Sequence, residues 1–245
     1  MSGITETLER MAEKLSRRAT LSPEDREALL ELPYTIKVVE AGRYIAREGA
    51  PVETSVLILS GIAFRHKLTA EGARQIVSIH IAGDFVDLEG SLLTVADHNV
   101  QALTRCELAL IPSRALIALV DAHPKVGRAM WIDTLIDASI FREWILNVGR
   151  RDAKGRIAHL LCEFARRLEV AGLAGREGYE FPMTQEQLAD ATGLTAVHVN
   201  RTLRTLEKEG LLCRERRFIQ VPDWERLRSV AGFNELYLHL DQVEV

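Results

Sequence analysis

Cysteine is scarce in this chain of 245 residues, which contains only Cys106, Cys162 and Cys213. These cysteines are far apart, odd in number and never paired as C-x-x-C, which argues against a disulfide framework and a cysteine-rich metal site. Apolar runs of the roughly 18 residues needed to cross a bilayer are also missing. The N-terminus is charged and amphipathic and lacks the apolar centre of a secretory signal. We therefore expect a cytoplasmic protein that makes no membrane contact.

Motifs that carry enzymatic chemistry are missing as well. Asp84, Asp87 and Glu89 lie close together in the sequence, but no partnered nucleophile, glycine-rich phosphate loop or H-E-x-x-H motif accompanies them. We interpret these three acids as part of a hydrated loop. No set of residues supports catalysis, so we expect that the protein is not an enzyme.

Charge is distributed unevenly along the chain, whose net charge is −4. Residues 150–217 contain 13 Lys and Arg against 10 Asp and Glu, whereas the remainder contains 18 against 25. A local basic excess attracts the phosphates of nucleic acid, although solvated helical faces are often as basic. The C-terminal part is therefore where we look for a nucleic-acid-binding site.

In the first half of the chain the residue pattern changes from one typical of helices to one typical of β-strands. An amphipathic N-terminal helix is followed by Ser22 and Pro23, which have the form of a helix start, and by a short helix to about Leu32. Short β-rich runs separated by glycines fill residues 34–112. Runs of this length and spacing predict a small antiparallel barrel or roll.

A long helix is predicted after the β-rich part. One helical stretch begins near Ser113, and the break at Pro124 starts a second that continues to Val148. The second would be about 37 Å long, and its apolar side chains cover more than one face, so it must be buried on two sides. We predict that one side packs on the roll and the other on the same helix of a second subunit. A central helix in a monomeric core is the alternative.

The pattern that points to function begins at Met183 and reads MTQEQLADATGLTAVHVNRTLRTLEKEGL. Thr184 can cap a first helix, and Gly193 permits a sharp turn after it. Ala189, Gly193 and Val199 have the spacing of a helix-turn-helix, in which a small residue lets the two helices cross closely. The sequence therefore predicts two short helices joined by a tight turn.

The second of these helices, which Thr195 can cap, has two opposite faces. The stripe that faces the core consists of Val199, Leu203 and Leu206. The outward stripe consists of Val197, Arg201, Arg204 and Lys208. In the major groove an arginine can pair with guanine and a valine can contact a thymine methyl group, so the outward stripe suits base recognition.

The segments LLCRE and RFIQV, which follow Gly210, predict a hairpin wing. Its arginines, Arg214, Arg216 and Arg217, are available to backbone phosphates. Two helices, a turn and a wing in this order favour a winged helix-turn-helix over a solvated helix with an incidental basic face. We place the start of this domain after Gly149, because Asp152 can cap a further helix there.

The order of elements resembles the Crp/Fnr family of transcription regulators over roughly residues 20–225. The resemblance is sharpest at AGDF, residues 82–85, and at LADATGLTAVHVNRTLRTLEKEGLL. It implies an α+β fold with an N-terminal antiparallel β-roll, like the cyclic-nucleotide-binding jelly roll, a long dimerisation helix and a C-terminal winged helix-turn-helix. The implied parts are N-terminal helices and sensor roll at 1–122, dimerisation helix at 123–149 and DNA-binding domain at 150–245.

In that family the recognition helix opens with Ser or Thr and carries a Glu, with an Arg four positions later. Thr195, Ala196, Val197 and Arg201 stand at the corresponding positions here, so the arginine is kept and Val197 replaces the glutamate. His198 and Asn200 are candidates for compensating contacts. The predicted DNA-binding residues are Thr184, Thr195, Ala196, Val197, His198, Asn200, Arg201, Arg204, Lys208 and Arg216.

The effector site of the roll is where this chain differs from relatives that bind cyclic AMP. Relatives that bind cyclic AMP carry a Gly-Glu pair and, about ten residues on, Arg-Ser, where this chain has Asp87-Leu88 and Ala96-Asp97. An aspartate facing a phosphate would repel it, and the N-terminal cysteine cluster of the iron-sulfur members is missing. We therefore expect an effector other than cyclic AMP and leave any cofactor unknown. Ligation of haem or a metal is an alternative for the histidines at positions 66, 80 and 98, although lone histidines are the commoner case.

The resemblance implies a homodimer that binds double-stranded DNA at a palindromic operator whose half-site centres are about 34 Å apart. RNA polymerase is a further expected partner. One alternative is a ligand-independent regulator that is controlled by its own abundance. Another is a β-roll sensor that acts through protein-protein contacts and uses the helix-turn-helix as a docking module.

Overall fold

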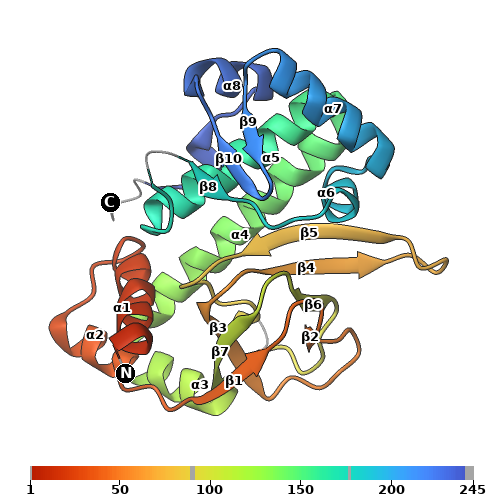
Figure 1. Cartoon of the computed structure of the whole chain (residues 1–245). Helices are drawn as coiled ribbons and strands as arrows, with labels where there is room; N and C mark the ends of the chain where they lie inside the picture. The colour runs from red at the N-terminus through yellow and green to blue at the C-terminus, as the bar shows by residue number, and fades with distance from the viewer. Residues whose placement is uncertain (1, 89–91, 176–177, 241–245) are drawn as a thin grey trace. The chain divides into compact units, whose positions relative to one another are not determined.

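The computed structural model describes residues 2–88, 92–175 and 178–240 (Figure 1). The chain divides into two compact units. The first comprises Met1–Lys67, Ile79–Ala138 and His239–Val245, and the second comprises Leu68–Ser78 and Ser139–Leu238. The division lies inside the long helix α4 (Pro124–Arg150).

Two β-sheets lie between residues 35 and 112, mostly in the first unit, although residues 68–78 are part of the second. Their strands are β1 (Thr35–Val39), β2 (Tyr44–Ala46), β3 (Thr54–Ser60), β4 (Ala63–Leu68), β5 (Arg74–His80), β6 (Asn99–Ala102) and β7 (Cys106–Pro112). One sheet has the order β1-β7-β3 and the other β2-β6-β4-β5. β7 pairs antiparallel with β1 and β3, and β6 pairs antiparallel with β2 and β4. The predicted antiparallel roll is therefore confirmed.

Strand β3 separates two apolar clusters of this unit. Successive side chains of a strand point to opposite faces, so Val56 and Ile58 join one cluster while Leu57 and Leu59 join the other. All four side chains are buried. A strand that is covered on both faces reads as a continuous apolar run, which explains the sequence VLIL at this point.

Helices cover the Leu57 side of β3 with apolar side chains. They are α1 (Ser2–Ser16), α2 (Pro23–Leu30), α3 (Ser113–Ala122) and the first part of α4. Buried members of this cluster include Leu15, Leu29, Leu57, Leu116 and Met130. Ser22 caps α2, and its hydroxyl accepts a hydrogen bond from the backbone N–H of Asp25. The helix start predicted at Ser22-Pro23 is therefore confirmed.

Ion pairs join α1 to the roll and to α4. Nζ of Lys14 lies 3.0 Å from Oδ1 of Asp84 and 2.7 Å from Oδ2 of Asp133. Burial lowers the pKa of Lys14, but the two carboxylates more than offset this effect and raise the pKa above its usual value. The hydrated loop predicted for Asp84 and Asp87 is wrong, because both side chains are buried and paired with cations or histidine. Glu89 lies outside the described residues.

The second unit is mostly helical. Its elements are α5 (Ala153–Val170), β8 (Tyr179–Glu180), α6 (Gln185–Thr192), α7 (Ala196–Lys208), β9 (Cys213–Glu215), β10 (Phe218–Gln220), α8 (Trp224–Ala231) and a 3₁₀ helix (Glu235–Leu238). Asp152 caps α5 as predicted, and its carboxylate accepts from the backbone N–H of Gly155. α5 contacts α6, α7 and α8 and is the central helix of this unit (Figure 1).

Among the residues that the structure describes, no helix is both long enough and apolar enough to span a bilayer.

Gly61, in the turn between β3 and β4, allows a close approach of two chain segments. Its φ is +89°, and a Cβ there would lie 2.3 Å from the carbonyl oxygen of Arg105 and 2.9 Å from Sγ of Cys106. We predict that Gly61→Ala lowers the free energy of unfolding by about 2 kcal/mol or more. Gly72→Ala is the matched control, because φ is +84° there and nothing lies within 4 Å.

Urea denaturation followed by circular dichroism measures both variants. The control should cost about 1 kcal/mol, the expense of a left-handed backbone alone. Equal losses in the two variants would contradict a steric role for Gly61.

Candidate nucleic-acid interface

The turn between α6 and α7 is fixed by caps on both sides. The Thr184 hydroxyl accepts from the backbone N–H of Gln187, whose side chain bonds back to Thr184. Gly193 ends α6 with φ at +64°, a left-handed conformation that glycine adopts without steric cost. The Thr195 hydroxyl then caps α7 by accepting from the backbone N–H of His198. The predicted helix-turn-helix is confirmed at each of these positions.

Helix α7 buries one face and exposes the other. Val199 and Leu206 are fully buried and Leu203 nearly so, and α7 contacts both α5 and α6. The predicted outward residues are all exposed, namely Val197, Arg201, Arg204 and Lys208. Val197 is 82% exposed although it is apolar. The helix thus presents a row of cations to solvent opposite its aliphatic stripe.

The remaining predicted residues lie around this row. Thr184, Thr195 and Arg216 are exposed, whereas Ala196, His198 and Asn200 are half-buried. Nδ2 of Asn200 donates to Oε1 of Gln185 at 3.1 Å, which joins α7 to the start of α6. Sequence reasoning missed Gln185. Its position directly after the cap Thr184, where a helix-turn-helix approaches its ligand, was the available signal.

The wing is a three-stranded sheet with the order β8-β10-β9. The hairpin β9–β10 agrees with the sequence prediction, whereas the short strand β8 was missed. Phe218 pairs with Glu215, so the hairpin turn consists of Arg216 and Arg217 alone. Arg216 has φ at +54°, a left-handed conformation that is uncommon outside glycine.

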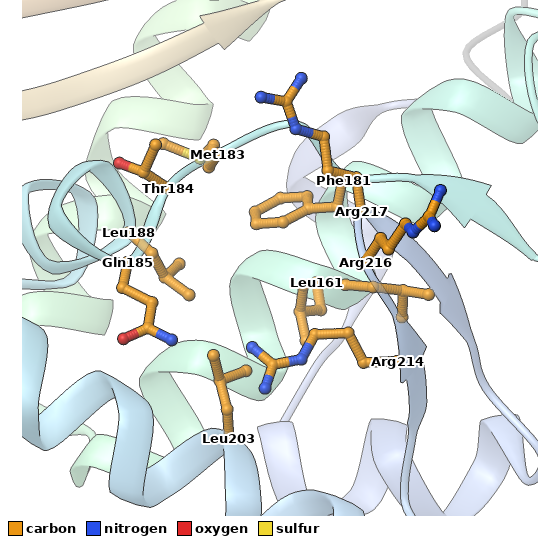
Figure 2. Close-up of a pocket in the computed structure, with 11 residues that line it drawn as sticks. Leu161, Phe181, Met183, Thr184, Gln185, Leu188, Leu203, Arg214, Arg216 and Arg217 are labelled. Carbon is orange, nitrogen blue, oxygen red and sulfur yellow. The ribbon is translucent and has the colours of Figure 1, made fainter.

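A pocket lies between the wing and the start of α6 (Figure 2). Its volume is about 410 Å³, including its opening to solvent. Apolar side chains such as Leu161, Leu188 and Leu203 line it together with Gln185, Arg214, Arg216 and Arg217. Nε of Arg214 lies 3.2 Å from Oε1 of Glu207 on α7, which holds the wing against the recognition helix. The arrangement places guanidinium groups beside a helix N-terminus, where a phosphate is attracted by both.

The first unit and the second thus define a class of protein: a jelly-roll domain followed by a winged helix-turn-helix. Sequence comparison agrees on both parts. Residues 36–123 match the cyclic nucleotide-binding domain, and residues 155–230 match the Crp-like helix-turn-helix domain.

Individual relatives cover most of the chain. It is 30% identical to the transcriptional activator protein FnrL of Cereibacter sphaeroides over 87% of each chain. It is also 30% identical to a probable transcriptional activator of Rhizobium leguminosarum bv. viciae, over 79% of this chain and 80% of that one. The structure of FixK2 from Bradyrhizobium japonicum superposes with a TM-score of 0.75 at 26% identity, covering 81% of this chain and 98% of that chain.

The chain belongs to the Crp/Fnr family of transcription regulators. It is therefore a regulator with a DNA-binding helix-turn-helix, and its relatives are regulators rather than enzymes.

Arg201 lies in the middle of the exposed row of α7. We predict that Arg201→Ala weakens operator binding by about 1 to 3 kcal/mol and relaxes the preference for guanine at one position. A mobility-shift titration at fixed salt measures the loss. Arg226→Ala, an exposed arginine on α8, is the matched control for removal of one positive charge. Unchanged operator affinity in Arg201→Ala would show that this residue reads no base.

Arg216 keeps a backbone conformation that glycine would adopt more easily. We predict that Arg216→Gly leaves the free energy of unfolding unchanged or raises it by about 1 kcal/mol, because the strain is relieved. Binding should weaken equally for operator and unrelated duplexes, and the salt dependence should fall by about one phosphate contact. Thermal melting and titrations at several salt concentrations test the two parts. A loss confined to the operator would instead mean that Arg216 contacts bases.

Proposed function

We propose that this chain is a homodimeric, sequence-specific regulator that binds a palindromic operator in double-stranded DNA through α7. The observation that carries the proposal is the exposed row of Val197, Arg201, Arg204 and Lys208 opposite a buried aliphatic stripe. A duplex needs phosphate contacts for affinity and groove contacts for sequence choice. The wing arginines supply the first kind and the exposed row supplies the second.

The proposed roles of the three parts of the chain use the boundaries predicted from the sequence. Residues 1–122 act as the sensor, residues 123–149 as the dimerisation helix and residues 150–245 as the DNA-binding domain. The proposed place of action is the cytoplasm, with RNA polymerase as a partner. Two relatives named as activators support the polymerase contact, because activation works through that enzyme.

Dimerisation is supported by a second face of α4. Its buried face includes Val126, Met130, Ile140 and Trp144. Its exposed apolar side chains are Trp131 at 67%, Leu135 at 52%, Ile145 at 69% and Leu146 at 46%. Trp131, Leu135, Ala138, Arg142 and Ile145 follow one another at alternating intervals of four and three residues. This is the spacing of a coiled-coil seam, so a second copy of α4 is the proposed cover.

The proposed effector is not cyclic AMP. Asp87 and Asp97 stand where the resemblance would place groups that hold the nucleotide. Nε2 of His98 lies 3.1 Å from Oδ1 of Asp87, and Nδ1 lies 2.5 Å from Oδ1 of Asp97. Burial lowers the pKa of His98, but its hydrogen bonds to the two aspartates raise it above the usual value. Carboxylates arranged around a histidine would repel a phosphate.

Selection of bound fragments from the host genome tests the proposed function. The full chain should enrich fragments that share an inverted repeat, with equal yield in the presence and absence of cyclic AMP. Binding of those fragments should weaken with salt as phosphate contacts are lost. Absence of salt-dependent DNA binding would favour the rival function, in which the helix-turn-helix docks on a protein.

Ile145 provides the test of the dimer. We predict that Ile145→Glu converts the chain to monomers and lowers operator affinity at least tenfold, because a charge would be buried in the seam. Sedimentation measures the mass and anisotropy measures the binding. Leu236→Glu, at a side chain that is 75% exposed in the 3₁₀ helix, is the matched control. A variant that stays dimeric would place the dimer contact elsewhere.

A further inference from the structure

The hydrogen bond between Asn200 and Gln185 places a polar amide beside the exposed row of α7. Nδ2 of Asn200 donates to Oε1 of Gln185 at 3.1 Å, and both residues are half-buried. At about 100° per residue, Asn200 lies roughly 60° around the helix from Val197, and it immediately precedes Arg201. Figure 2 shows the Gln185 side chain extending from the start of α6 toward α7.

The amide chemistry restricts what Asn200 can bind. An asparagine amide has two N–H donors and one oxygen acceptor. One donor is used by Gln185, so one N–H and Oδ1 remain for a ligand. Rotating the amide by half a turn would set Oδ1 against the oxygen of Gln185, which opposes rotation. As long as Gln185 keeps Oε1 toward Asn200, as in the structure, Nδ2 of Asn200 donates and Oδ1 stays available to the ligand, and reversing these roles requires both amides to turn together.

Adenine is the base that fits this remaining pair. In the major groove adenine presents N7 as an acceptor and its N6 amino group as a donor, whereas guanine presents two acceptors, N7 and O6. A guanine would face Oδ1 of Asn200 with an acceptor. The thymine paired with adenine adds a methyl group, and Val197, three residues before Asn200, is an exposed apolar side chain without any polar atom to satisfy.

We propose that Asn200 reads an adenine next to the guanine read by Arg201, and that Gln185 is a positioning residue that holds the Asn200 amide in the adenine-reading orientation. This inference rests on the proposed function and deepens it. At the position where the family has a glutamate, this chain has Val197, which offers no hydrogen-bond acceptor. The acceptor is instead Oδ1 of Asn200, and the preferred base pair becomes A·T.

Three substitutions of Gln185 separate orientation from simple packing. Gln185→Glu keeps an acceptor for Asn200, so the adenine preference should persist. Its negative charge near the phosphates should lower the affinity for every DNA sequence. Gln185→Lys offers a donor instead, so Oδ1 should turn toward it and leave two N–H groups, which favours guanine. Gln185→Met offers neither and should reduce the preference. Asn200→Ala should remove it.

The experiment is selection of the full-length protein and each variant on a duplex library randomised at the base pair beside the guanine that Arg201 reads. Wild type and Gln185→Glu should prefer adenine by about tenfold, the discrimination of one good bidentate contact. Gln185→Lys should shift the preference toward guanine. Thermal melting confirms that each variant is folded. A purely structural Gln185 would change melting temperature and leave base preference the same.

The possible failures are distinguishable. If wild type shows no sequence-selective binding, the proposed function fails and this inference fails with it. If wild type selects a palindrome whose guanine depends on Arg201, but Asn200→Ala keeps the same preference beside it, only the inference is overturned. An adenine preference that survives in Gln185→Lys would also overturn the role of Gln185.

Discussion

Burial of the aliphatic face of α7 against α5 and α6 is the constraint on which the interface depends. Val199 and Leu206 have no exposed surface, and they fix the rotation of α7 about its own axis. Burial of each aliphatic side chain stabilises the fold by about 1.5 to 3 kcal/mol. Turning α7 the other way would lose this stabilisation and would also cost the free energy of burying its cations. The exposed row therefore needs no interaction of its own to face solvent.

The platform under α7 is itself stabilised by a buried polar group. Glu163 of α5 accepts hydrogen bonds from the indole N–H of Trp144 at 3.0 Å and from the hydroxyl of Tyr237 at 2.7 Å. Burial raises the pKa of Glu163, although Arg167 and these two donors oppose the shift. A buried carboxyl with directed partners fixes one arrangement of the last part of α4, α5 and the 3₁₀ helix.

Local signals in the sequence were enough for the caps and the two faces of α7, because each depends on residues close together in the chain. The roll pairs strands that are far apart in the sequence, such as β1 and β7, and it was predicted from the length and spacing of its β-rich runs and from the family resemblance. Ser22, Asp152, Thr184 and Thr195 are caps that bond within three residues. The failures have a common origin in contacts between distant segments. Asp84 is paired with Lys14, which lies 70 residues earlier in the chain, and Gln185 contacts Asn200 on the next helix. The left-handed Arg216 had no glycine to reveal it.

The side chains of the exposed row are not needed for packing, so they can change during evolution without loss of the fold. Side chains that contribute nothing to packing are usually replaced at a cost within about 0.5 kcal/mol. Val197, at 82% exposure, shows how far the chemistry of this row is free from the demands of folding. Under the proposed function, single substitutions in this row change the operator that is bound and leave the scaffold intact, so the set of regulated genes can change without passing through unstable intermediates.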